Sequence, residues 1–110
     1  MSATSTGREA ESRVCTELVQ RGHKILSQNW RTRWCEIDIV STNKGCVYFT
    51  EVKFRRSTTW GTGLAYITDK KLQQMQFAAE LWLSHHSWKG EACLMAAEVD
   101  DKYAIHLTEL

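Results

Sequence analysis

The chain has 110 residues, which is enough for one domain with a single modest core. Hydrophobic residues make up 43% and charged residues 25%, a balance that fits a soluble globular protein and excludes a disordered or membrane-embedded chain. The net charge of +1 excludes a uniformly basic surface, so any binding of nucleic acid must depend on local clusters of charge.

Two further features of composition bear on where the protein works. No apolar stretch approaches the roughly 20 residues that a membrane-spanning helix needs, and the polar start lacks the apolar core of a secretory signal. We therefore expect a cytoplasmic protein without a membrane segment. The four cysteines form no CxxC pair and have no histidines at zinc-finger spacing, so we expect small buried side chains rather than zinc ligands or disulfides.

The N-terminal part of the chain predicts a helix. We expect residues 1–6 to be a disordered tail and residues 7–110 to form a single domain. Ser5 or Thr6 can cap a helix that runs to about Arg21, because short polar side chains accept hydrogen bonds from the first helical amides.

One carboxylate in this helix is unusual. Gly22 marks the end of the helix, and apolar residues recur along it at helical spacing, namely Ala10, Val14 and Leu18. Glu11 follows directly after the first of these residues and lies at or near the apolar stripe. A carboxylate beside a buried stripe is a candidate functional group.

The remaining elements are predicted from runs of β-forming residues and from turn and cap signals. Strands are expected over residues 23–30, 35–41, 46–55, 92–99 and 103–107. Thr68 can cap a second helix from Asp69 to about Ser84, with a core stripe of Leu72, Met75, Ala79 and Trp82. Residues 56–66, around Trp60, are expected to form a loop. The predicted order is α-β-β-β-α-β-β, an α/β fold with a mixed sheet flanked by helices.

The second and third strands are predicted to form a hairpin with two alternative registers. A two-residue loop at Asn43-Lys44 places Asp38 opposite Phe49, whereas a loop at Lys44-Gly45 places it opposite Glu51. In both registers strand alternation places Asp38 and Glu51 on one face with Lys53. The same alternation assigns Ile37 and Ile39 together to the opposite face.

Two facing carboxylates with a lysine beside them suit metal-assisted hydrolysis. Carboxylate oxygens are ligands that Mg²⁺ prefers, and a divalent ion would remove the repulsion between Asp38 and Glu51. Lys53 could then stabilise charge on a phosphate or help to activate water, and Glu11 could complete an acidic ring. The alternative is a cross-strand ion pair between Lys53 and either carboxylate. Glu36 could hold a second ion, or it could pair with Arg33 or Lys53.

At these residues the sequence resembles the YraN family of uncharacterised bacterial proteins, which is similar to archaeal Holliday junction resolvases of the PD-(D/E)xK nuclease superfamily. The resemblance covers roughly residues 7–85. Its motifs are Gly7 and Glu11, Gly22-His23-Lys24-Ile25-Leu26, Asn29-Trp30-Arg31, Glu36-Ile37-Asp38-Ile39-Val40, Glu51-Val52-Lys53-Phe54-Arg55, Gly61 and Lys71. The chain departs from the family at Ala10, Cys35 and Met95.

The resemblance implies a restriction-endonuclease-like fold and an endonuclease that uses Mg²⁺ or Mn²⁺ to cut DNA, on branched, recombination or repair intermediates. It implies that Asp38 and Glu51 bind the metal, that Lys53 is the catalytic lysine, and that Glu11 is the helix glutamate. It also implies a homodimer, since symmetric cuts in two strands need two active sites.

Four basic residues are the candidates for contacts with nucleic-acid phosphates: Arg31, Arg55, Arg56 and Lys71. Two other function classes remain open from the sequence. One is a nucleic-acid-binding module of the same fold that does not cut. The other is a protein-interaction domain that uses some of the five tryptophans.

Overall fold

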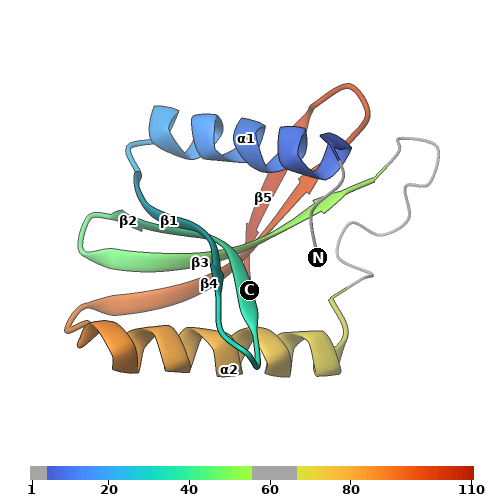
Figure 1. Cartoon of the computed structure of the whole chain (residues 1–110). Helices are drawn as coiled ribbons and strands as arrows, with labels where there is room; N and C mark the ends of the chain where they lie inside the picture. Colours follow the sequence, from blue (N-terminus) through green and yellow to red (C-terminus); the bar gives the residue numbers. More distant parts are fainter. Residues whose placement is uncertain (1–4, 56–66) are drawn as a thin grey trace.

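The structure, a computed structural model, describes residues 5–55 and 67–110. Within these residues two helices enclose a five-stranded sheet, with α1 on one face and α2 on the other (Figure 1). The elements are α1 (Ser5–Gln20), β1 (Lys24–Arg31), β2 (Glu36–Asn43), β3 (Cys46–Phe54), α2 (Asp69–His86), β4 (Glu91–Val99) and β5 (Ile105–Glu109). The predicted element order is confirmed, as is the mixed α/β architecture expected of a restriction-endonuclease-like fold.

The sheet is mixed because of a single crossover. Its strand order follows the chain, β1-β2-β3-β4-β5. The first three strands form an antiparallel meander, β4 runs parallel to β3, and β5 is antiparallel to β4. Parallel neighbours need a connection that crosses the sheet, and α2 provides it. Neither helix of the described residues is long and apolar enough to cross a membrane.

The predicted apolar stripe of α1 is confirmed. Its three members are fully buried and pack against Ile39 and Val99 on the α1 face of the sheet; they are Ala10, Val14 and Leu18, all 0% exposed. The helix begins at Ser5, so Ser5 and Thr6 belong to it instead of preceding it. Gly22 ends the turn that follows, with a φ of +98°, and the N–H of His23 donates to the Leu18 carbonyl at 2.9 Å.

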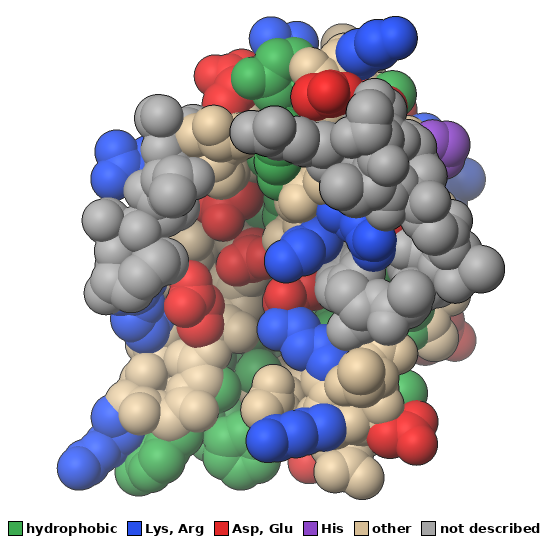
Figure 2. Space-filling model, turned by 90° about the vertical axis from the view of Figure 1, so that its right-hand side faces the viewer, with side chains coloured by type: hydrophobic (Ala, Val, Ile, Leu, Met, Phe, Trp, Pro, Cys, Tyr) green, Lys and Arg blue, Asp and Glu red, His purple; other side chains and the backbone are tan. Residues whose placement is uncertain are grey.

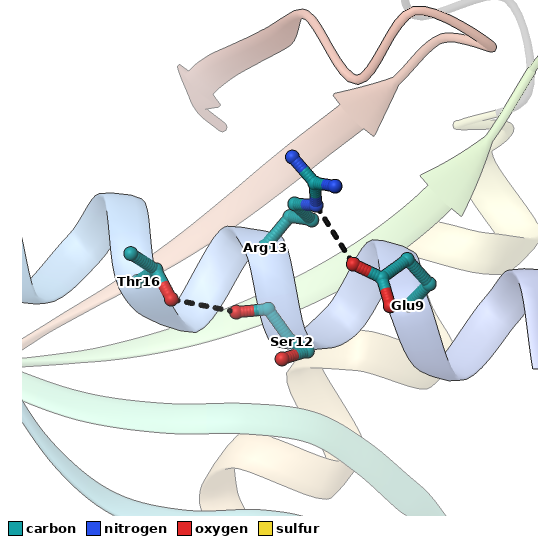
Figure 3. A network of polar contacts seen from close by, with 4 residues as sticks. All are labelled: Glu9, Ser12, Arg13 and Thr16. Atoms are coloured by element: carbon teal, nitrogen blue, oxygen red, sulfur yellow. Dashed lines mark hydrogen bonds and ion pairs between the residues drawn. The ribbon is translucent and has the colours of Figure 1, made fainter.

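Contacts on the outer side of α1 hold the helix in place. Arg13 donates from Nε to Glu9 Oε2 at 2.7 Å, and Thr16 Oγ1 donates to the Ser12 carbonyl at 3.2 Å (Figure 3). Such exposed contacts one turn apart stabilise a helix by only about 0.3–0.5 kcal/mol each. The Arg13 guanidinium also lies 4.1 Å from the centre of the Tyr103 ring, which ties α1 to the turn between β4 and β5.

The second helix covers the other face of the sheet. Thr68 caps it as predicted, since its hydroxyl accepts from the Lys71 N–H at 3.1 Å. The helix extends two residues beyond the predicted end, and Ser87 follows it in a left-handed conformation. Ala78, Ala79 and Trp82 are its buried residues and pack on the sheet against Val40, Val47 and Phe49.

The predicted alternation of β2 is wrong at its beginning. Ile39 packs in the cluster under α1, whereas Ile37 packs with Val40 in the cluster under α2. The two isoleucines therefore do not share a face. The cause is a fork in the sheet: β2 remains paired with β1 as far as Glu36, but its pairing with β3 ends at Ile39 and Thr50. Without β3 beside it, β2 is free to turn at Asp38.

Candidate active site

The β2–β3 hairpin determines which carboxylates meet. Its turn is Lys44-Gly45, with both residues at positive φ, the backbone geometry that tight two-residue hairpin turns need. Pairing runs from Asn43 opposite Cys46 to Ile39 opposite Thr50. Of the two predicted registers, this is the one in which Asp38 would be the next residue opposite Glu51, although the pairing itself ends at Ile39 and Thr50.

Asp38 lies in the fork where β2 and β3 separate. Its Oδ2 accepts a hydrogen bond from the Val52 N–H at 2.8 Å. That amide faces the side from which β2 has turned away, so the carboxylate replaces the main-chain acceptor that a continued ladder would supply. The hydrogen bond anchors the Asp38 side chain and keeps it beside β3.

The surroundings of Asp38 disfavour its negative charge. Burial raises the pKa of Asp38 from 3.8 to about 7, and the neighbouring carboxylates of Glu51, Glu11 and Glu36 add to the increase. The Val52 hydrogen bond acts in the opposite direction and is too weak to offset them. A half-buried carboxylate surrounded by other carboxylates is a place where a bound cation would be strongly stabilised.

A cleft of about 530 Å³ brings the predicted site residues together. It is lined from five elements, by Arg8 and Glu11 of α1, Asn29 and Arg31 of β1, Glu36 and Asp38 of β2, Glu51, Val52 and Lys53 of β3, and Lys71 of α2. Figure 2 shows acidic side chains gathered in the middle of this face, with Lys and Arg side chains beside them. All four residues predicted as catalytic therefore line one cleft.

Two of the four acidic side chains in the cleft have cationic partners. Lys71 Nζ lies 2.8 Å from Glu51 Oε2, and Arg31 lies 3.5 Å from Glu36. Lys53 is exposed and forms no ion pair with any residue of the described parts of the chain. The alternative of a cross-strand pair between Lys53 and Asp38 or Glu51 is therefore not what the structure contains. Glu36 pairs with Arg31, and not with Arg33 or Lys53, the two partners that the sequence suggested.

Glu11 is held by a residue that the sequence did not single out for a role. The Asn29 side chain hydrogen-bonds to the Glu11 carboxylate. Asn29 has a φ of +54°, a left-handed conformation that asparagine tolerates better than most residues. Burial raises the pKa of Glu11, and Glu36 and Glu51 raise it further, while the Asn29 hydrogen bond lowers it. A lone asparagine in a strand gives no signal in the sequence that it adopts this conformation.

The four predicted phosphate-binding residues separate into different environments. Arg31 and Lys71 line the cleft, where each is already in an ion pair. Arg55 is not part of the lining, and its guanidinium lies 3.7 Å from the buried Glu98 carboxylate. Arg56 lies outside the described residues, and so does Trp60.

The donor set suits a hard divalent cation that keeps much of its water. Within residues 5–55 and 67–110, no three His, Cys, Asp or Glu side chains lie close enough together to hold a metal ion. Mg²⁺ nevertheless commonly binds through only one or two carboxylates and water. Asp38 and Glu11 supply such oxygens, and neither has a cationic partner among these residues.

Comparison with known proteins places the chain among close relatives. The sequence profile of the uncharacterised protein family UPF0102 matches residues 10–101. A UPF0102 protein of Pseudomonas fluorescens is 38% identical over 84% of this chain and 76% of its own length. One of Cytophaga hutchinsonii is 30% identical over 94% of this chain and 93% of its own length. One of Stutzerimonas stutzeri is 37% identical over 81% of this chain and 75% of its own length.

Proposed function

The chain belongs to the uncharacterised protein family UPF0102, the YraN family that its sequence motifs resemble, and from the chemistry of the cleft we propose that it is a divalent-metal-dependent endonuclease. Its substrate is DNA, and the reaction is hydrolysis of a phosphodiester bond with Mg²⁺ or Mn²⁺. The observation that carries the proposal is the position of Asp38: a half-buried carboxylate in the β2–β3 fork, surrounded by Glu11, Glu36 and Glu51.

Asp38 and Glu51 are the proposed metal ligands. One oxygen of Asp38 is engaged by the Val52 amide, which fixes the orientation of the carboxylate and leaves its other oxygen for a cation. Glu11 extends the set of oxygens from the opposite wall of the cleft, held by Asn29. A bound cation would lower the pKa of a water ligand and act as a Lewis acid on the phosphate.

Lys53 is the proposed partner of the scissile phosphate. Its ammonium is exposed, lines the cleft and is not neutralised by any carboxylate of the described residues. It is therefore available to donate to a phosphate oxygen on which negative charge develops. Lys71 can bind a phosphate only if its ion pair with Glu51 breaks. A metal bound to Glu51 and a phosphate bound to Lys71 would both favour breaking that pair.

The basic residues around the cleft would attract the negatively charged DNA backbone. Arg8 and Arg31 lie at the cleft with Lys53 and Lys71. Neutralising phosphates with such residues releases counterions, so affinity should fall steeply as the salt concentration rises. The resemblance stated above adds branched or recombination intermediates as substrates and a homodimer as the active form, both as parts of this proposal.

A cleavage assay tests the proposal directly. Linear, nicked, flapped and four-way DNAs are incubated with Mg²⁺, Mn²⁺ or a chelator, using wild-type protein, Asp38→Asn, Lys53→Met and the control Glu80→Gln. Glu80 is an exposed carboxylate on α2 that does not line the cleft. Cleavage should require the metal, fall at least about 100-fold in Asp38→Asn and Lys53→Met, and remain unchanged in Glu80→Gln. Cleavage that persists in Asp38→Asn would refute the assignment.

A second candidate function is a module that binds nucleic acid without cutting it. The absence of a three-ligand group among the described residues favours it, as does the engagement of Glu51 by Lys71. It predicts DNA binding that persists in chelator and no product at any metal concentration.

A further inference from the structure

A second groove, of about 560 Å³, lies beside the cleft. One wall is the turn that leads into β2, with Trp34, Cys35 and Glu36. The other wall is the first turns of α2, from Lys70 to Phe77. The groove and the cleft share three lining residues, Glu36, Glu51 and Lys71, so the two hollows adjoin each other. Figure 2 shows hydrophobic side chains along the lower edge of this face, below the acidic centre.

Two large aromatic side chains are exposed along the groove. Trp34 is 69% exposed and Phe77 is 49% exposed. Leaving such rings in water forgoes the free energy that their burial would provide, so a pair of them beside a polar site suggests a binding surface. Neither ring belongs to one of the two core clusters. Replacing either ring should therefore leave both core clusters intact.

Trp34 is presented by an ordered turn. The Thr32 hydroxyl accepts from the Trp34 N–H at 3.1 Å and from the Cys35 N–H at 3.2 Å, and the Thr32 N–H donates to the Cys35 carbonyl at 2.9 Å. These three bonds fix the backbone on both sides of the ring. Little conformational entropy is then lost when a flat ligand stacks on it.

The charges around the groove favour nucleic acid over an apolar protein segment. The Arg33 guanidinium lies 5.4 Å from the centre of the Trp34 ring, and Lys70 and Lys71 line the opposite wall. The two carboxylates that also line the groove, Glu36 and Glu51, are paired with Arg31 and Lys71. Amide side chains of Gln73 and Gln74 complete the lining. Aromatic rings interleaved with cations are the combination that binds single strands, with bases stacked on the rings and phosphates near the cations.

We propose that this groove binds an unpaired nucleotide of the strand being cut, with its base stacked on Trp34 and its phosphate near Arg33 and Lys70. This inference rests on the endonuclease proposed above and defines its substrate class: DNA that has a single-stranded segment next to the scissile phosphate. A base within an intact duplex is already stacked between its neighbours, so a continuous duplex leaves the groove unfilled.

Binding measured in chelator separates the groove from catalysis. Fluorescence anisotropy compares a labelled single strand, a duplex of the same length and a duplex with a single-stranded overhang. Trp34→Ala should weaken binding of the single strand and the overhang about 5- to 150-fold, the range for loss of one base stack. Its binding of the duplex should change less than threefold. Trp34→Phe should restore most of the loss, because a ring is retained.

Val19→Ala is the matched control, since Val19 is an exposed apolar residue on α1 that is part of neither hollow. Thermal unfolding of each variant verifies that the fold is intact, and sedimentation shows whether the groove instead joins two copies of the chain. Equal binding of single strands by wild type and Trp34→Ala would overturn the proposal, as would dissociation of a dimer in Trp34→Ala without any change in DNA binding.

The two proposals fail in different ways. If Asp38-dependent cleavage occurs equally on continuous duplex and on overhangs, and Trp34→Ala does not change this ratio, the groove assignment is wrong and the endonuclease stands. If single strands bind in a Trp34-dependent manner but no metal supports cleavage, the endonuclease is wrong and the groove remains as a binding site.

Discussion

The Lys71 ammonium of α2 lies 2.8 Å from the Glu51 carboxylate of β3, so the helix supplies a positive charge to one of the two proposed metal ligands. The pair connects β3 and α2, which residues 56–66 separate in sequence. Asp38, whose pKa is raised to about 7, has no such ion pair with a cation of the described residues. A divalent cation bound as proposed would therefore compete with Lys71 for the oxygens of Glu51.

This competition gives the first prediction. Lys71→Met should bind Mn²⁺ about 3- to 10-fold more tightly than wild type in titration calorimetry, because removing an ion-paired ammonium frees a carboxylate whose pair is worth roughly 1 kcal/mol. The same variant should bind DNA more weakly if Lys71 contacts a phosphate. Lys89→Met is the control, since Lys89 lies beyond the far end of α2 and does not line the cleft. Unchanged or weaker Mn²⁺ binding in Lys71→Met would contradict the competition.

The raised pKa of Asp38 predicts how the stability of the metal-free protein depends on pH. The folded protein holds the Asp38 proton with a pKa of about 7, compared with 3.8 in the absence of these surroundings. The contribution of this group to stability is therefore fully present below about pH 4, and it is lost as the pH rises through 7. Above pH 7 the ionised carboxylate destabilises the fold.

Asp38→Asn should consequently be more stable than wild type at pH 8, by about 2 kcal/mol after allowance for solvent screening. An asparagine oxygen can still accept the Val52 hydrogen bond without carrying charge. The difference should shrink towards zero near pH 4. Urea unfolding in chelator at both pH values measures it, and Glu80→Gln provides a carboxylate replacement outside the cleft. A wild type that is the more stable protein at pH 8 would disprove the prediction.

Asn29 offers a test of how Glu11 is positioned. Asn29→Ala removes the hydrogen bond to Glu11, and alanine tolerates a φ of +54° less well than asparagine, whose short polar side chain can hydrogen-bond locally. It should lower the free energy of unfolding by about 1–2 kcal/mol. Asn29→Gly removes only the hydrogen bond and keeps the backbone unstrained, so it should lose less. If the Asn29 hydrogen bond positions Glu11 for the proposed metal, both variants should weaken Mn²⁺ binding alike. Normal binding in both would show that Asn29 does not position Glu11 for a metal.

Arg55 is expected to matter more for folding than for DNA. Its partner Glu98 is only 3% exposed, and removing one member of a buried pair typically costs about 3–5 kcal/mol. Arg55→Met should therefore destabilise the protein strongly in urea unfolding. The double variant Arg55→Met/Glu98→Met should recover much of this loss, because no charge is left buried. A double variant no more stable than Arg55→Met would indicate that Glu98 is not the cause.

The sequence predicts most of the fold because its signals are local. The stripe of Ala10, Val14 and Leu18, the stop at Gly22 and the cap at Thr68 each depend on a few neighbouring residues, and each is found in the structure. The hairpin register was narrowed to two alternatives by turn chemistry. Positive φ angles at Lys44 and Gly45 decide between them.

The features that escaped prediction depend on distant parts of the chain. Ile37 changes face because β3 leaves β2 at the fork, and no alternation pattern contains that information. The pairing of Lys71 with Glu51 depends on how α2 crosses the sheet. Trp34 carried no recognisable signal, because exposure of a tryptophan is decided by what else covers it. Spacing and resemblance thus predicted residues that line one cleft, whereas the partners of these residues could be seen only in the tertiary structure.

The tight turn at Lys44-Gly45 also has a consequence for the order of folding. Only twelve residues separate Asp38 from Glu51, so a hairpin can bring the two acids together within microseconds, whereas the Lys71 ammonium arrives only when the slower parallel β3–β4 crossover closes. During that interval no ammonium offsets the repulsion between the two carboxylates. Acidification should therefore accelerate refolding, because protonated carboxylates do not repel each other. At neutral pH the repulsion within the cleft would raise the free-energy barrier to folding.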